Sequence, residues 1–362
     1  MKKLIFILLI INLSCTTSGD QQFINRFVVG NAKLLKTIKN NDIQVKLTVI
    51  DSTENFIEYE YNIDTKKYFY PASTVKLPIA LFALEKLNEN KILSIDTPFM
   101  LEDDTLKTTF KNELEKVFIL SDNQANNRFF EFIGQDYINK KFKAKGFFNS
   151  TIFHRLSTSN SSKLKGKRVD FFTNDSIISF QNNNKEPEKL KLKNIKKGKG
   201  YINSSGNLIK KEMDFSKKNY ISITDLHRIM KILFFPNKFK EKERFNLTNK
   251  QREILFNYMS GYPKDFGYSF EEFPHYFTKF FIYGDKKLEL DENIIIYNKV
   301  GFAYGQLSDV AYIKKNNVSI ILTATIDVNT NKIYNDDKYD YDSIGFPFLA
   351  EISREIIKTL SN

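Results

Sequence analysis

The sequence predicts an α+β fold, with an antiparallel sheet built from both ends of the chain, helices flanking it and a helical lobe beside it. Alternating apolar and polar residues, which mark half-buried strands, occur at 45–51 and 56–61 and return in the last third of the chain. Between these regions apolar residues recur at helical spacing. Strands, then helices, then strands is an order typical of α+β domains.

Composition limits the class of protein further. The 362 residues are 41% hydrophobic, which is enough for a large buried core and too apolar for a disordered chain. A single cysteine excludes an internal disulfide, and three widely spaced histidines argue against zinc, so we expect no metal and no cofactor. The net charge of +12 requires an acidic partner to be considered.

Residues 1–14 have the features of a secretory signal peptide. Two lysines precede an apolar run of eight residues, whereas about 20 are needed to cross a bilayer. The only cysteine, Cys15, follows where bacterial lipoproteins are lipidated, although Asn12 stands where an aliphatic residue is usual. We expect a lipid anchor at Cys15 and an extracytoplasmic protein tethered to a bacterial membrane, in the periplasm or at the cell surface. The alternative is an ordinary cleaved signal with an incidental cysteine.

The elements follow in order. After a tether and first helix over 15–40, the predicted elements are a hairpin over 45–61, a buried helix over 77–84, two or three helices within 112–145, a helix over 221–235 capped by Ser222 or Thr224, a helix over 247–259 capped by Thr248, strands at 293–297, 307–313 and 318–328, and a final helix over 348–360.

The segment from about 157 to 215 interrupts this pattern. It is rich in Asn, Lys, Ser and Gly without a sustained period, and residues 161–201 hold 11 Lys and Arg against 4 Asp and Glu. We interpret it as a solvated insertion, partly ordered at best. The predicted organisation is an α/β lobe of 41–68 and 216–362, a helical lobe of 69–215 that carries the insertion, and a site in the cleft between them.

Chemistry is first indicated where the buried helix begins. Ser73 and Lys76 in Pro71–Lys76 are three residues apart and share a helical face. A buried lysine with a lowered pKa can take the proton of a serine nucleophile. Ser162 and Lys165 have the same spacing, but they lie in the polar insertion, which favours the first pair.

Two further motifs are weak singly. Ser121-Asp122-Asn123 begins a predicted helix, where Ser121 could relay a proton and Asn123 could contact Lys76 or the substrate; the alternative is a plain helix cap. Lys299-Val300-Gly301 follows a strand. Lys299 could hold a substrate carboxylate and Gly301 could allow a close approach; the alternative is an exposed lysine beside a bulge glycine.

Together, in this order, the three motifs resemble those of class A β-lactamases and penicillin-binding proteins. The resemblance covers about 41–362 apart from the insertion, and is strongest to β-lactamase-like lipoproteins of low-GC bacteria. It implies that Ser73 is acylated, that Lys76 is its base or a proton relay, and that Ser121 and Asn123 complete the proton path. It also implies that Lys299 anchors a carboxylate, and that the backbone N–H groups of Ser73 and Phe302 form the oxyanion hole.

The sequence departs from that family in two places. Val300 replaces the usual hydroxyl residue, which removes one hydrogen bond to the substrate. The loop after His154-Arg155-Leu156 continues as Ser157-Thr158-Ser159, without the glutamate that activates the deacylating water. Glu186-Pro187-Glu188 resembles the family's local sequence slightly and could supply the missing base; the alternative is a solvated loop, because it lies within the basic insertion. The acyl-enzyme should therefore form more readily than it hydrolyses.

The leading hypothesis is a serine hydrolase that opens a β-lactam or a related amide through an acyl-enzyme. The alternatives are a D-Ala-D-Ala peptidase or esterase on the same scaffold, and a non-catalytic lipoprotein that binds cell-wall peptide. Expected partners are a small β-lactam or peptidoglycan-peptide substrate and the membrane, with no nucleic acid, because aromatic residues are not interleaved with the basic run at 185–199. We expect a monomer.

Overall fold

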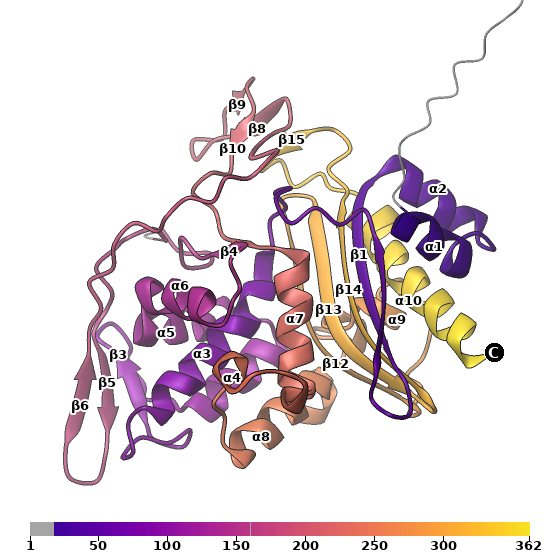
Figure 1. The fold of residues 1–362 in the computed structure, drawn as a ribbon. Coiled ribbons are helices and arrows are strands. Elements are labelled where there is room, and N and C mark those ends of the chain that lie inside the picture. The colour runs from indigo at the N-terminus through magenta and orange to yellow at the C-terminus, as the bar shows by residue number, and fades with distance from the viewer. Residues whose placement is uncertain (1–17, 160) are drawn as a thin grey trace, which may run out of the picture.

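The computed structural model describes residues 18–159 and 161–362. The expected signal peptide and Cys15 lie outside the described residues. The described part forms an antiparallel sheet with helices on both faces and a helical lobe to one side (Figure 1). The predicted α+β fold is therefore confirmed. No helix in residues 18–159 and 161–362 combines the length and the apolar character needed to cross a membrane.

The five-stranded sheet joins the two ends of the chain, as predicted. Its strands, in spatial order, are β12 (Ile294–Ala303), β13 (Gln306–Lys315), β14 (Val318–Asp327), β1 (Asp42–Ile50) and β2 (Phe56–Tyr61). Neighbouring strands are antiparallel, and Leu47 of β1 lies opposite Leu322 of β14. Strand β12 forms one edge of the sheet, and this edge faces the cleft.

Separate helices cover the two faces of the sheet (Figure 1). One face packs on the terminal helices and a short helix: α1 (Ser18–Phe27), α2 (Ala32–Asn40), α9 (Phe280–Tyr283) and α10 (Phe346–Ser361). The other face packs on α7 (Ile223–Phe234). Of the two caps proposed for α7, Ser222 is the one observed, since its side chain accepts from the backbone N–H of Asp225 at 3.1 Å.

The helical lobe surrounds one buried helix. Its helices are α3 (Lys76–Asn88), α4 (Phe110–Ile119), α5 (Asn123–Ile133), α6 (Gln135–Ala144) and α8 (Asn249–Ser260). Most of α3 is buried, as its nearly continuous apolar sequence predicts. Thr248 caps α8 in a capping box with Gln251, also as predicted.

The insertion is more regular than its sequence predicts. Short strands pair within it and with distant parts of the chain. They are β3 (Phe99–Leu101), β4 (Ser150–Thr151), β5 (Val169–Phe172), β6 (Ile177–Phe180), β7 (Lys196–Lys197), β8 (Gly200–Ile202), β9 (Leu208–Ile209), β10 (Met213–Asp214), β11 (Tyr220–Ile221) and β15 (Ile333–Tyr334). Because β5 pairs with β3 and β8 with β15, this order comes from long-range pairing that leaves no local period.

Candidate active site

Ser73 lies in a tight turn against the edge of the sheet. It is the second residue of a 3₁₀ turn (Ala72–Val75) that leads directly into α3. Ala72 has a φ of 47°, a left-handed conformation that is uncommon for a residue with a side chain. The hydroxyl of Thr74 donates to the carbonyl of Pro71 at 2.6 Å and closes the turn. The N–H of Ser73 is thus among the first of the helical segment, where no helical carbonyl can accept it.

Gly301 allows this turn and strand β12 to touch. A Cβ at position 301 would lie 2.7 Å from the backbone nitrogen of Ser73 and 2.7 Å from the carbonyl oxygen of Pro71. No side chain fits at that distance without a backbone shift. The predicted close approach at Gly301 is therefore observed, but its neighbour is the turn that carries Ser73. The approach brings the backbone of Phe302 to the same place.

Three predicted residues meet at one hydroxyl. Ser121 has a φ of 53° and directs both its carbonyl and its hydroxyl toward Lys76. The amine of Lys76 donates to that carbonyl and lies 3.4 Å from Ser121 Oγ. The amine of Lys299 donates to the same Oγ at 2.8 Å. We call Ser73, Lys76, Ser121 and Lys299 the catalytic wall.

Both amines are buried, which changes their protonation. Lys76 is fully buried, and burial lowers its pKa to about 7, against the carboxylate of Asp122, which raises it. Lys299 is 1% exposed, so the alternative of an exposed strand lysine is wrong. Burial lowers the pKa of Lys299 well below its usual range, and the positive charge of Lys76 lowers it further. Neutral Lys76 is available near neutral pH, and an arriving anion would favour charged Lys299.

Ser73 itself is not yet in contact with its predicted base. Among the described residues, the Ser73 hydroxyl makes no hydrogen bond, and Lys76 is held by Ser121 instead. Catalytic hydrogen bonds are often longer in the free enzyme and shorten when substrate binds. One of the two contacts expected of Asn123 is not observed: its Nδ2 donates to Ser157 Oγ at 2.9 Å and not to Lys76.

A second buried polar cluster supports the strand that carries Lys299. The amine of Lys279 donates to Asn298 Oδ1 at 2.8 Å, and Asn298 Nδ2 donates to the carboxylate of Asp309 at 2.9 Å. Burial lowers the pKa of Lys279 to about 7 and raises that of Asp309 to about 6. No sequence pattern indicates this cluster, because its members come from three separate segments.

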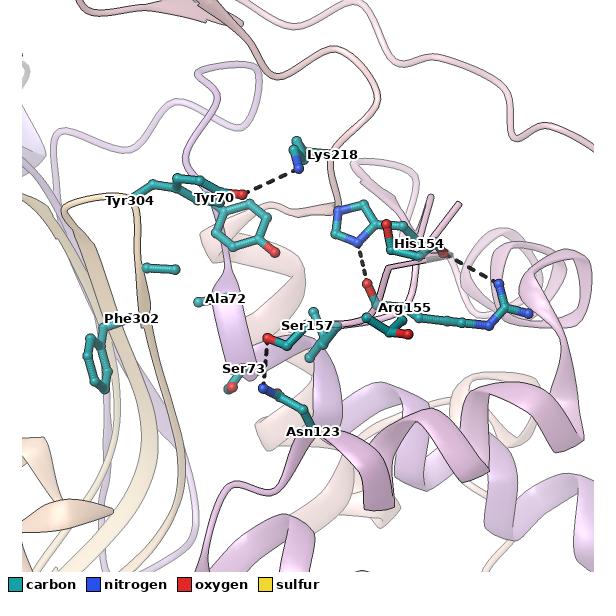
Figure 2. Close-up of a pocket in the computed structure, with 14 residues that line it drawn as sticks. Tyr70, Ala72, Ser73, Asn123, His154, Arg155, Ser157, Lys218, Phe302 and Tyr304 are labelled. Carbon is teal, nitrogen blue, oxygen red and sulfur yellow. Dashed lines mark hydrogen bonds between the residues drawn. The ribbon is translucent and has the colours of Figure 1, made fainter. Parts of the chain in front are cut away.

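Ser73 opens into a cleft of about 340 Å³. Figure 2 shows Asn123 and Ser157 beside Ser73, with Phe302 across from them. No carboxylate is found among the described residues that line the cleft, which are Tyr70, Ala72, Ser73, Asn123, His154, Arg155, Leu156, Ser157, Thr158, Ser161, Lys218, Phe302, Ala303 and Tyr304. Within residues 18–159 and 161–362, no group of three or more His, Cys, Asp or Glu is placed to hold a metal ion.

Comparisons with known proteins agree with the fold and with these motifs. A sequence model of the β-lactamase enzyme family matches residues 31–360. The chain belongs to this β-lactamase family. No curated protein sequence matches it significantly.

Solved structures share the β-lactamase fold at low identity. A variant of the TLA-1 extended-spectrum β-lactamase is 14% identical with a TM-score of 0.57, covering 95% of this chain and 100% of its own. A class A β-lactamase from Bacteroides cellulosilyticus is 14% identical with a TM-score of 0.56, covering 96% and 100%. The protein PBP-A is 15% identical with a TM-score of 0.53, covering 91% and 97%. These likenesses establish the fold alone.

The segment His154–Thr158, which we call the loop wall, faces the catalytic wall of this β-lactamase-family cleft. The buried guanidinium of Arg155 forms an ion pair with Glu131 of α5. The side chain of Asn127 accepts from the N–H of Leu156 at 2.9 Å and donates to its carbonyl at 2.8 Å. Sequence analysis did not single out Asn127 or Glu131. The loop wall is held rigidly, yet the residue that it presents beside Ser73 is Ser157.

The two glutamates considered as replacements lie elsewhere. Glu186 pairs with Lys217 at 2.6 Å and Glu188 with Lys143 at 2.5 Å, all with exposed side chains. Neither glutamate lines the cleft. Ser162, the competing motif serine, is exposed in the insertion.

Two positions near Gly301 face away from the catalytic wall. Val300 is 3% exposed and belongs to the apolar core shared with α9 and α10. A hydroxyl at position 300 would be buried in that core and not exposed to the cleft. A hydroxyl residue in place of Val300 would therefore not by itself restore the expected hydrogen bond to the substrate. The ring of Phe302 packs edge-on against Phe280, Tyr341 and Phe346, which leaves its backbone as the part nearest Ser73.

The far end of the cleft holds a group that sequence analysis missed. Tyr70 packs edge-on against Tyr304 with ring centroids 5.0 Å apart, and His154 lies nearly parallel to Tyr70. Lys218 donates to the hydroxyl of Tyr304 at 3.4 Å. These four residues come from distant segments: Tyr70 and Tyr304 lie close to the first and third motifs, whereas His154 and Lys218 do not. No local pattern could have shown their meeting.

Proposed function

We propose that the protein is a serine hydrolase that forms an acyl-enzyme on Ser73 with a β-lactam or a related amide and releases the acyl group slowly. The observation that carries the first half is the pair of buried amines at Ser121, within a β-lactamase fold. The second half rests on the absence of any carboxylate among the residues that line the cleft.

Acylation uses the catalytic wall. Ser73 Oγ attacks the amide carbonyl as its proton passes to the neutral amine of Lys76. The carbonyl oxygen gains the negative charge, which the backbone N–H groups of Ser73 and Phe302 stabilise. When the C–N bond breaks, the leaving nitrogen takes a proton that comes from Lys76 through the hydroxyl of Ser121.

Lys299 acts on the substrate and on this proton path together. Its amine binds the carboxylate next to the leaving nitrogen, and that contact favours its charged form. A charged Lys299 in turn makes the neutral form of Lys76 more favourable, because two positive charges at one buried hydroxyl repel each other.

Deacylation requires a water molecule and a group that takes its proton. The position beside Ser73 on the loop wall is Ser157, whose hydroxyl is a poor base at neutral pH. Arg155 is already paired with Glu131 and carries no basic lone pair. We therefore expect the acyl-enzyme to persist.

Intact mass spectrometry on residues 18–362 tests this proposal. Incubation with a penicillin should add the mass of the whole β-lactam, because ring opening expels no fragment, and Ser73→Ala should add nothing. Rapid turnover without an adduct would contradict slow release, and an adduct equally abundant in Ser73→Ala would contradict the assigned nucleophile.

A peptidase or esterase on this scaffold is a second candidate. A linear amide differs from a β-lactam because its leaving group departs from the cleft after acylation and leaves room for water. The fold shared with PBP-A and the lack of a carboxylate among the described lining residues support this route. Release of D-Ala from an acylated D-Ala-D-Ala peptide, lost in Ser73→Ala, would support it. The third hypothesis, a non-catalytic binding protein, requires that neither adduct nor product forms.

We also propose that the protein is tethered outside the cytoplasm through lipid on Cys15. The support is the signal-like sequence before that residue. Expression in a bacterium fed an alkyne fatty acid should label the full chain, and Cys15→Ser should abolish the label. A cleaved, unlabelled and freely released protein would favour the ordinary signal.

A further inference from the structure

The cleft continues beyond Ser73 to a cationic end. In Figure 2, Lys218 and Tyr304 lie at the end of the cleft opposite Ser73. Tyr70 and His154 lie between that end and Ser73. Lys218 immediately precedes Asn219, whose side chain is bonded to the backbone of His154. This attachment fixes the place of Lys218 relative to the loop wall.

The charge of Lys218 has no carboxylate partner among the described residues. Its amine contacts only the hydroxyl and the ring face of Tyr304, at 3.4 Å and 5.6 Å from the ring centroid. Its neighbour Lys217 is paired with Glu186 at 2.6 Å. The two adjacent lysines thus differ: the charge of Lys217 is neutralised outside the cleft, and the charge of Lys218 stays available inside it.

The other basic groups that line this part of the cleft are occupied or neutral. Arg155 is paired with the buried carboxylate of Glu131. Burial lowers the pKa of His154 to about 4, and the charge of Lys218 contributes to this. The Nδ1 of His154 lies 2.5 Å from the carbonyl oxygen of Arg155, which fits a neutral ring that donates there. Of the described residues that line the cleft, Lys218 is therefore the cation left to meet an anion.

We propose that the Lys218 end of the cleft binds a carboxylate at the far end of the substrate's acyl arm, so that the protein prefers amides with an anionic acyl arm. This rests on the proposed acyl-enzyme at Ser73. Lys299 would then hold the carboxylate on the leaving-group side, and Lys218 a second one on the acyl side. The aromatic walls of Tyr70 and Tyr304 would enclose the apolar part of the arm.

Two penicillins that differ only at the end of the arm test this. One carries an adipoyl group on 6-aminopenicillanic acid, and the other a hexanoyl group of the same length that ends in a methyl. The second-order rate constant for acylation of Ser73, followed by intact mass, should be about tenfold higher for the adipoyl compound, the value of one charge-assisted hydrogen bond.

Matched variants assign that preference to one side chain. Lys218→Met should bring the adipoyl-to-hexanoyl ratio close to one, whereas Lys217→Met, which removes a neighbouring charge outside the cleft, should leave the ratio unchanged. Equal rates in the unaltered protein would overturn the proposal. So would a preference that survives Lys218→Met, or one that Lys217→Met removes equally.

Binding to Ser73→Ala separates this proposal from the acylation chemistry. Calorimetry should give a lower Kd for the adipoyl compound, and the added change Lys218→Met should remove the difference. Equal Kd values would overturn the anionic subsite. A difference in Kd together with no adduct in the unaltered protein would support the subsite and refute the proposed acyl-enzyme.

Discussion

On the catalytic wall, two buried amines meet at the hydroxyl of Ser121 and neither forms an ion pair with a described carboxylate, whereas on the loop wall the buried guanidinium of Arg155 is paired with Glu131. Unpaired burial lowers the pKa of an amine and makes it reactive, whereas pairing fixes a charge in place and makes it structural. The difference supports the acyl-enzyme that we propose for the catalytic wall, and it indicates that the loop wall mainly shapes the space.

The largest expected effect comes from removing the base on the catalytic wall. Lys76→Met should slow acylation of Ser73 by about 10²–10⁴-fold, the usual contribution of a general base. Intact mass spectrometry of samples quenched at successive times measures the rate. Lys86→Met, near the other end of α3, should stay close to the unaltered protein; an equal loss in both variants would show that the helix, and not the base, was damaged.

The next largest effect is expected from adding a general base to the loop wall. Ser157→Glu should place a carboxylate beside Ser73 and speed release of the acyl group by about tenfold or more, as a general base for water. The decay of the adduct after removal of free penicillin measures this. Ser159→Glu, which adds the same charge outside the lining of the cleft, is the control, and faster decay in both would mean that charge alone suffices.

The rate of acylation should also depend on pH through the catalytic wall. Because burial lowers the pKa of Lys76 to about 7, the neutral amine is lost as the pH falls below that value. The rate constant should fall by about tenfold per pH unit below about pH 6.5 and level off above about 7.5. A profile that is flat from pH 5 to 8 would exclude Lys76 as the base.

The smallest effect concerns stability. The pKa of Lys76 and that of Lys279 are about 7 in the folded chain and about 10.4 when unfolded, so the unfolded chain binds more protons between these values. Stability should therefore rise with pH from about 7 to 9, by up to about 1.4 kcal/mol per unit for each group. The slope of Tm against pH should decrease in Lys279→Met and persist in Lys218→Met. An unchanged slope in Lys279→Met would contradict the buried neutral amine.

The sequence predicted the elements whose reasons are local. Ser222 and Thr248 cap helices because a side-chain oxygen reaches an N–H three residues on, and that spacing can be read directly. The alternating strands and the three motifs are likewise local patterns. They were enough to predict a sheet made from both chain ends and, through the family resemblance, Lys76, Ser121 and Lys299 as residues of one site.

What could not be predicted depends on distant pairing. Asn127 bonds Leu156, and Lys218 reaches Tyr304, only after the chain has folded. The insertion lacked a period because strands such as β5 find their partner outside it. The burial of Val300 could not be predicted, because a motif compares residue types and does not show what packs against the face of the strand on which Val300 lies.

Asn219 fastens the two ends of the insertion together. Its side chain accepts from the N–H groups of Phe153 and His154 and donates to the carbonyl of His154. The excursion between 157 and 218 is therefore a closed loop, and the entropy of closing such a loop grows only with the logarithm of its length. The outer part of the segment can therefore vary in length at little cost in free energy, provided that Asn219 and the cleft-lining residues at the two ends of the segment, Ser157 and Lys218, are kept.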